Sequence, residues 1–146
     1  MIVGNAVSTG NAGYWMHQFR TWLTGRGLHA YDEATLTCYL KIAAHMSAVF
    51  GERTAAGTFA QAEDVLFVNK TSSMTELFDQ QLLAAWLNFA DGAIPLDRLV
   101  DTNGDKVGDM TFLDAVVAAE RVRLDPGATR LQLEAQKILL ERINQP

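Results

Sequence analysis

Apolar residues recur at helical spacing along most of the chain. Near the start, Trp15, Phe19 and Trp22 follow one another at intervals of four and three residues. This spacing places their side chains on one face of an α-helix. Gly25 and Gly27 come shortly after and are expected to end the helix, because glycine readily adopts the conformations that terminate helices. The pattern therefore predicts a first helix that begins near residue 11.

The same periodicity predicts further helices. They are expected at residues 32–50, 58–68, 74–91, 95–99, 112–124 and from 129 onward. Several of these segments are preceded by a short polar residue or a carboxylate, which can accept hydrogen bonds from the free backbone N–H groups of a helix start. The clearest case is Ser73, which forms a capping-box pattern with Glu76. Pro95 suits the first turn of the short helix before residue 100.

The segment after Ser73 is the most apolar in the chain and is the expected central helix. We expect Trp86, in its middle, to be almost fully buried. No run of strand length alternates between apolar and polar residues. The predicted fold class is all-α, a compact bundle of about five to six helices built from residues 11–146, with residues 1–10 as an irregular lead-in. The apolar positions of the central helix are Phe78, Leu82, Ala85, Trp86 and Phe89.

Composition limits the kinds of partner and the covalent cross-links that this chain is expected to have. A chain of 146 residues is long enough to bury a real core as one domain. Its formal net charge of −5 gives no electrostatic reason to expect a nucleic acid or an anionic membrane as partner. No apolar run approaches the roughly 18 residues that span a bilayer, so membrane insertion is not expected. The single Cys38 excludes an internal disulfide.

The most informative stretch is the polar loop from Asp101 to Asp109. Side chains that carry oxygen stand at its positions 1, 3, 5 and 9, and the residue at position 7 can offer its backbone carbonyl. This is the ligand rhythm of an EF-hand-like calcium loop, in which six to eight oxygens surround a hard cation. The sequence therefore predicts a calcium site. Its candidate ligands are Asp101, Asn103, Asp105, Val107 and Asp109.

Two residues depart from the EF-hand pattern. Position 6, where the sharp turn normally requires glycine, is Lys106, and position 12, where a bidentate glutamate normally completes the site, is Phe112. The missing ligand is expected to come either from Asp109 or from Asp114, two residues beyond the usual place. The alternative interpretation is a polar turn without a metal, because Asp, Asn and Gly all favour turns.

Histidine and cysteine offer a weaker set of candidates. Cys38, His45, His17 and His29 are the conceivable zinc ligands, but no two of them have the close spacing that zinc sites usually show. An enzyme with a site at His17 and His45 is a further alternative. The chain has no phosphate-binding glycine loop, no HExxH helix and no recognisable nucleophile motif. We therefore expect a protein that is not an enzyme.

Two patches together resemble a known module. Gly13-Tyr14-Trp15 with His17 near the start, and residues 81–93 in the central helix, are similar to a poorly characterised module of large secreted proteins of bacteria and archaea. Some versions of that module continue into an Asp-rich loop, as this chain does. The resemblance covers most of residues 13–125. It implies a non-enzymatic module of a secreted or cell-surface protein, and it supplies no activity.

The loop by itself also resembles half of a dockerin repeat or a thrombospondin-type calcium repeat. A dockerin carries two such loops, each with Asp at position 12, whereas this chain has one loop with Phe112 there. The leading hypothesis is thus a calcium-binding structural or adhesive module. The alternative is a dockerin-like docking module, whose partner would be another protein domain or a surface component.

Overall fold

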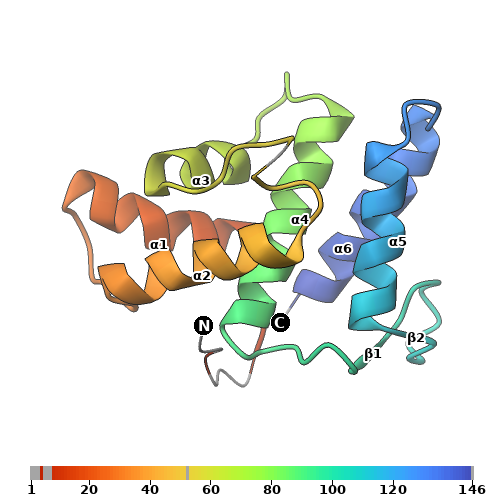
Figure 1. Ribbon diagram of the computed structural model, residues 1–146, viewed down its shortest axis with the longest axis horizontal. Helices are drawn as coiled ribbons and strands as arrows, with labels where there is room; N and C mark the ends of the chain where they lie inside the picture. The colour runs from red at the N-terminus through yellow and green to blue at the C-terminus, as the bar shows by residue number, and fades with distance from the viewer. Residues whose placement is uncertain (1–3, 5–7, 52, 146) are drawn as a thin grey trace.

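The computed structural model describes residue 4, residues 8–51 and residues 53–145 of the chain. These residues form six helices and one two-stranded sheet (Figure 1), so the predicted all-α bundle of five to six helices is confirmed. The irregular lead-in expected at residues 1–10 is described only at Gly4 and from Ser8 onward, and its remaining residues lie outside the described part. The helices are α1 (Ala12–Thr24), α2 (Glu33–Met46), α3 (Phe59–Leu66), α4 (Met74–Ala90), α5 (Phe112–Leu124) and α6 (Arg130–Asn144).

Each helix begins where a polar side chain caps it. The six capping residues all have extended backbone and accept a hydrogen bond from the backbone N–H three residues later. Such a bond satisfies one of the free donors at a helix start. Ser73 and Glu76 form the predicted capping box, and two further capping boxes open α3 and α6. The capping residues are Asn11, Asp32, Thr58, Ser73, Thr111 and Thr129.

Helix α2 ends earlier than the sequence predicted, at Met46 rather than near Phe50. Ser47 leaves the helical conformation, and its hydroxyl accepts hydrogen bonds from the backbone N–H groups of Val49 and Phe50. The same hydroxyl donates to the buried carboxylate of Glu120, 73 residues further along the chain. This long-range bond competes with continuation of the helix, and no local pattern reveals it.

The prediction of a short helix at residues 95–99 is wrong. Pro95 to Arg98 form a turn, and the chain then enters β1 (Leu99–Val100), which pairs antiparallel with β2 (Met110–Thr111). The carbonyl of Arg98 accepts the backbone N–H of Phe112, across the polar loop. Because the residues on either side of the loop satisfy one another's backbone groups, an extended conformation replaces the helix.

Helix α4 forms the centre of the bundle. It runs between the group of α1, α2 and α3 on one side and the pair of α5 and α6 on the other (Figure 1), and it contacts all five of these helices. Residues 82–88 are buried on every face of the helix, as expected for a helix surrounded by others. Trp86 is fully buried, which confirms the expectation from its position, and its indole N–H donates to Glu120.

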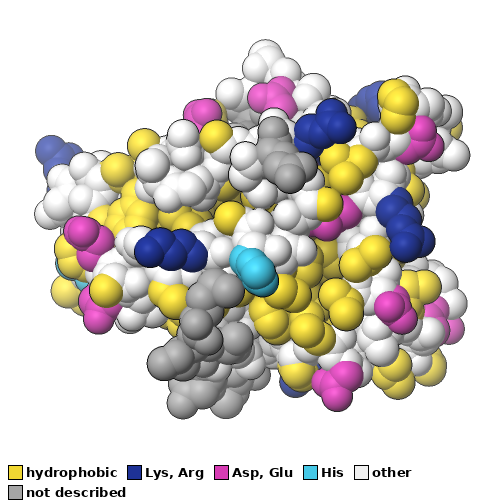
Figure 2. Space-filling view, viewed as in Figure 1, with side chains coloured by type: hydrophobic (Ala, Val, Ile, Leu, Met, Phe, Trp, Pro, Cys, Tyr) yellow, Lys and Arg dark blue, Asp and Glu magenta, His cyan; other side chains and the backbone are white. Residues whose placement is uncertain are grey.

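Charged side chains are dispersed over the face of the molecule that Figure 2 shows. On the face seen in Figure 2, acidic and basic side chains alternate with apolar ones, and neither sign gathers into one large area. Among the described residues, no helix is both long enough and apolar enough to cross a bilayer.

Replacing Trp86 by alanine tests the central position of α4. Trp86 has no exposed surface, so we expect Trp86→Ala to lower the free energy of unfolding by about 3–5 kcal/mol, the usual range for a large buried aromatic side chain. Urea unfolding measures the change. Phe67→Ala is the control, because that side chain is 50% exposed, and it should cost less than about 1 kcal/mol. A cost below about 1 kcal/mol for Trp86→Ala would contradict the fold.

Candidate metal-binding loop

The polar loop is held at both ends by regular structure. It leaves β1 at Val100 and returns to β2 at Met110, and the backbone N–H of Asp109 donates to the carbonyl of Val100 over 3.0 Å. Helix α5 begins directly after β2. Phe112, at the position of the usual EF-hand glutamate, is fully buried and its ring lies 5.9 Å from that of Trp86. This residue therefore anchors α5 to the central helix instead of facing the loop.

Asp101 organises the first half of the loop. One carboxylate oxygen accepts the backbone N–H groups of Asn103 and Gly104 over 3.0 and 2.7 Å, and the other accepts that of Lys106 over 2.8 Å. Partial burial of the carboxyl acts to raise its pKa. The three N–H donors and the nearby guanidinium of Arg142 outweigh this and hold the pKa of Asp101 below its ordinary value. Asp101 is thus a carboxylate at neutral pH.

The next two candidate ligands repeat the same type of turn. The side-chain oxygen of Asn103 accepts the N–H of Asp105, and a carboxylate oxygen of Asp105 accepts the N–H of Val107, two residues on in each case. These Asx turns bend the backbone at alternate residues. Lys106 then adopts a left-handed conformation with φ of 67°. An EF-hand loop places glycine at this sixth position because of its sharp turn.

The last two candidates are placed differently. Both carboxylate oxygens of Asp109 accept the hydroxyl of Thr102, over 2.8 and 2.9 Å, and one also accepts the Thr102 backbone N–H. Asp114 lies in the first turn of α5 and is exposed. In the described part of the chain, no three or more His, Cys, Asp or Glu side chains converge closely enough to hold a metal ion. The candidate metal ligands are oxygens, as calcium requires. In this structure the carboxylates of Asp101, Asp105 and Asp109 instead accept hydrogen bonds from other groups of the loop.

The conceivable zinc ligands are not brought together. His17 and His45 are exposed on two different helices, α1 and α2, and Cys38 is half-buried on α2. His29 stacks on the indole of Trp22 with 3.8 Å between ring centroids, and its Nδ1 lies 3.1 Å from the hydroxyl of Thr21. This histidine therefore serves local packing.

Sequence reasoning did not identify the polar role of Asn88. This residue is fully buried in α4, and its side-chain oxygen accepts the backbone N–H of Gly10 and the indole N–H of Trp15. Its amide nitrogen donates to the carbonyl of Gly10 and to the side chain of Asn144 in α6. A lone amide within the most apolar segment is the signal that predicts such a network, because a buried amide needs partners.

Asp91 forms a second buried network at the end of α4. Its two carboxylate oxygens accept the hydroxyls of Tyr31 and Tyr39, and the Tyr31 hydroxyl also lies 2.8 Å from that of Tyr14. Burial raises the pKa of Asp91 above its ordinary value, although the two tyrosine hydrogen bonds partly oppose this. Burial and the same carboxylate also raise the pKa of both tyrosines. The tyrosine hydroxyls therefore stay protonated and act as donors.

These two networks join the two patches on which the expected resemblance rests. Trp15 of the Gly-Tyr-Trp segment bonds to Asn88, and Tyr14 is joined through Tyr31 to Asp91. Asn88 and Asp91 both belong to the second patch. Compared with known protein families, curated proteins and solved structures, the chain matches none of them.

A glycine at position 106 tests the left-handed turn of the loop. Alanine is strained there by about 1 kcal/mol or more, whereas glycine is not. Glycine also loses more backbone entropy on folding, which offsets part of that gain. We therefore expect Lys106→Gly to unfold at higher urea concentration than Lys106→Ala. At Lys41, an exposed site within α2, the order should reverse, with glycine less stable by about 1 kcal/mol. If the glycine variant were the more stable one at both sites, or the less stable one at both, the left-handed conformation of Lys106 would be contradicted.

Proposed function

We propose that this domain is a calcium-binding structural or adhesive module of a secreted or cell-surface protein, and that the loop at residues 101–109 holds the ion. The observation that carries the proposal is the backbone of the loop. It curves through Asx turns at positions 1, 3 and 5 and takes a left-handed residue at position 6. An EF-hand-like loop distributes its ligands in this way.

The ligands of the ion would be those that the sequence predicts. Asp101, Asn103 and Asp105 supply side-chain oxygens from alternate turns, and Val107 supplies its carbonyl. Binding requires Asp105 to turn its carboxylate from the backbone to the ion. This costs one hydrogen bond, the one that the carboxylate accepts from the backbone N–H of Val107. The remaining oxygens would come from Asp109, which must then release Thr102, or from Asp114 at the start of α5. Calcium tolerates such irregular oxygen sets better than magnesium does.

The ion would brace the junction between the central helix and α5. The loop is followed by β2 and then by α5, whose first residue, Phe112, packs against Trp86 of α4. Arg142 of α6 also lies close to the loop, near Gly104. An ion that fixed the loop would therefore hold α4, α5 and α6 in place relative to one another. This action is structural, which agrees with the non-enzymatic module that the chain resembles.

A second candidate is docking of a partner protein beside the loop. Three apolar side chains at the loop and its flanking strands are exposed: Leu99 by 61%, Val107 by 63% and Met110 by 37%. Leu99 and Met110 lie on opposite faces of the sheet, because Leu99 pairs with Thr111 and Met110 with Val100. Exposed apolar surface of this kind is the feature that favours a docked partner. This candidate is compatible with a calcium site, because ordering of the loop would fix the positions of Leu99 and Val107.

Thermal unfolding tests the calcium proposal. Binding to the folded state alone raises the free energy of unfolding by RT ln(1 + [Ca²⁺]/Kd), which is about 2.7 kcal/mol at a hundredfold excess over Kd. For a chain of this size the melting temperature should rise by several degrees. We expect a Kd of about 10⁻⁵ to 10⁻³ M, since the site lacks the usual glutamate. Magnesium should shift the melting curve much less.

Asp105→Asn is the decisive variant. Its amide oxygen can still accept the N–H of Val107, so the turn is kept while one charged ligand is lost. The calcium-dependent shift should disappear or become much smaller. Asp97→Asn, an exposed change outside the loop, removes the same charge and should leave the shift intact. A wild-type melting curve that calcium does not move, or an equal loss of the shift in both variants, would refute the proposal.

A further inference from the structure

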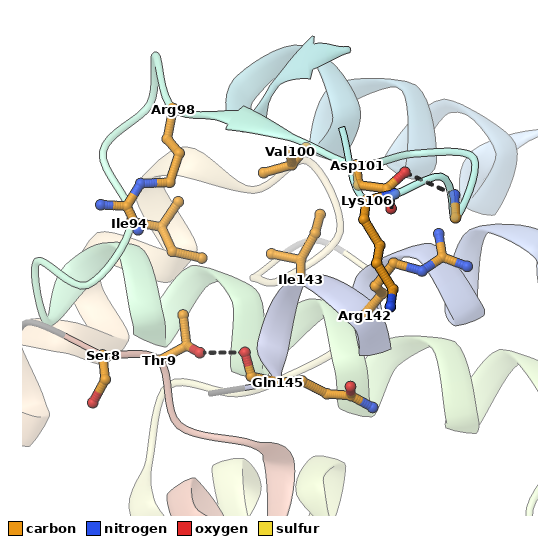
Figure 3. Close-up of a pocket in the computed structure, with 11 residues that line it drawn as sticks. Ser8, Thr9, Ile94, Arg98, Val100, Asp101, Lys106, Arg142, Ile143 and Gln145 are labelled. Atoms are coloured by element: carbon orange, nitrogen blue, oxygen red, sulfur yellow. Dashed lines mark hydrogen bonds between the residues drawn. The ribbon is translucent and has the colours of Figure 1, made fainter. Parts of the chain in front are cut away.

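A pocket lies beside the polar loop, on the side that faces α6. Its volume is about 540 Å³, within the range of about 300–1,000 Å³ that small-molecule sites occupy. It is bounded by residues 94–106, by the end of α6 and by residues 8 and 9 of the lead-in (Figure 3). Three separate parts of the chain thus form one concave surface.

The floor of the pocket is apolar. Ile94, Val100 and Ile143 form it, and each is at least nine-tenths buried. Ser8, Thr9 and Gln145 form the polar rim, where the Thr9 hydroxyl donates to the carbonyl of Gln145 over 2.8 Å. An apolar floor with a few polar groups at its edge is typical of sites that take a small organic ligand.

The charged groups of the pocket are mainly cationic. Arg98, Lys106 and Arg142 line it together with one carboxylate, Asp101. Figure 3 shows Lys106 and Arg142 at one end and Arg98 at the other, with Val100 and Ile143 between them. None of the salt bridges within the described part of the chain includes any of these three cations. The oxygens of Asp101 accept three backbone N–H groups of the loop.

Two of the cationic side chains, Arg142 and Arg98, contact backbone groups beside the pocket. The guanidinium of Arg142 lies against Gly104, where a side chain at that residue would come within 3.4 Å of its nitrogen. The guanidinium of Arg98 donates to the carbonyl of Ala93 over 3.1 Å. Lys106 and Arg142 lie at the same end of the pocket and repel each other. The carboxylate of Asp101 offsets part of the charge of Arg142, and an anion between the two cations would relieve the remaining repulsion.

We propose that this pocket binds a small organic carboxylate with a short apolar chain. The carboxylate lies between Lys106 and Arg142, where the planar guanidinium can donate two parallel hydrogen bonds to it. The apolar chain lies over Val100 and Ile143 and extends toward Ile94. The pocket itself needs no metal ion, but it shares Asp101, Gly104 and Lys106 with the loop, so the site is tested with the loop free of calcium.

Binding is tested by titrating ¹⁵N-labelled protein with hexanoate and following amide chemical shifts. The buffer is freed of metal ions on a chelating resin, because soluble chelators are themselves carboxylates. We expect saturable shifts at Val100, Gly104 and Ile143. Two probes with the same chain, 1-hexanol and hexylammonium, should bind at least about tenfold more weakly, because each lacks the charge-assisted hydrogen bonds. Equal binding of hexanol, or no saturable shifts around the pocket, would overturn the proposal.

Variants separate the pocket from the overall charge of the protein. Arg142→Met and Lys106→Met should each weaken hexanoate binding about tenfold and leave hexanol binding unchanged. Arg130→Met is the matched control, because it removes the same charge from the opposite end of α6 and should not change the affinity. Amide spectra of the free variants establish that each is folded. An equal effect of Arg130→Met and Arg142→Met, or no effect of either pocket variant, would refute the assigned site.

Discussion

The packing of this bundle depends on one buried amide. Asn88 lies in the middle of the chain's most apolar helix, where an amide without partners would cost several kcal/mol. All four of its hydrogen-bonding positions are used: two acceptor positions on the oxygen and two donors on the nitrogen. Its partners come from the lead-in, α1 and α6. These segments can therefore pack on α4 in one register only, because any shift would leave the amide unpaired.

Other buried polar groups act in the same manner. Glu120 of α5 accepts hydrogen bonds from Ser47, from the backbone of Ala48 and from Trp86, and so joins α2, α4 and α5. Arg123 and Asp79 form a salt bridge of 2.8 Å between α5 and α4. Within the described part of the chain, no buried side-chain nitrogen or oxygen lacks a partner. Apolar burial drives the collapse of these helices, and the polar pairs select one arrangement among many.

Sequence reasoning succeeded where the determinants are local. Helix starts were predictable because a capping residue bonds to a backbone group only three residues away, as Ser73 does. Sequence reasoning failed where a residue far along the chain determines the local conformation. Helix α2 stops at Ser47 because of Glu120. The segment after Pro95 is a turn and a short strand because Phe112 pairs with Arg98. Neither partner is visible in a local pattern.

The candidate loop shows the same division. Its turns follow from the alternation of Asp and Asn, since each side chain bonds to a backbone group two residues away. The bond of Asp109 to Thr102 was not predicted, because spacing alone does not say whether a carboxylate bonds to the loop or points to a common centre. The pocket beside the loop was also invisible in sequence, since its walls come from residues more than 130 positions apart.

The hydrogen bond between Thr9 and Gln145 has a mechanical consequence. It places residue 9, near the start of the described chain, beside residue 145, its last described residue. A domain in which residues 9 and 145 are in contact can be inserted into a surface loop of another protein, or be circularly permuted through a linker. If tension were applied through residues 9 and 145, it would act first on their mutual contact and on the lead-in bonded to Asn88. The two-stranded sheet and its loop would lie outside that load path.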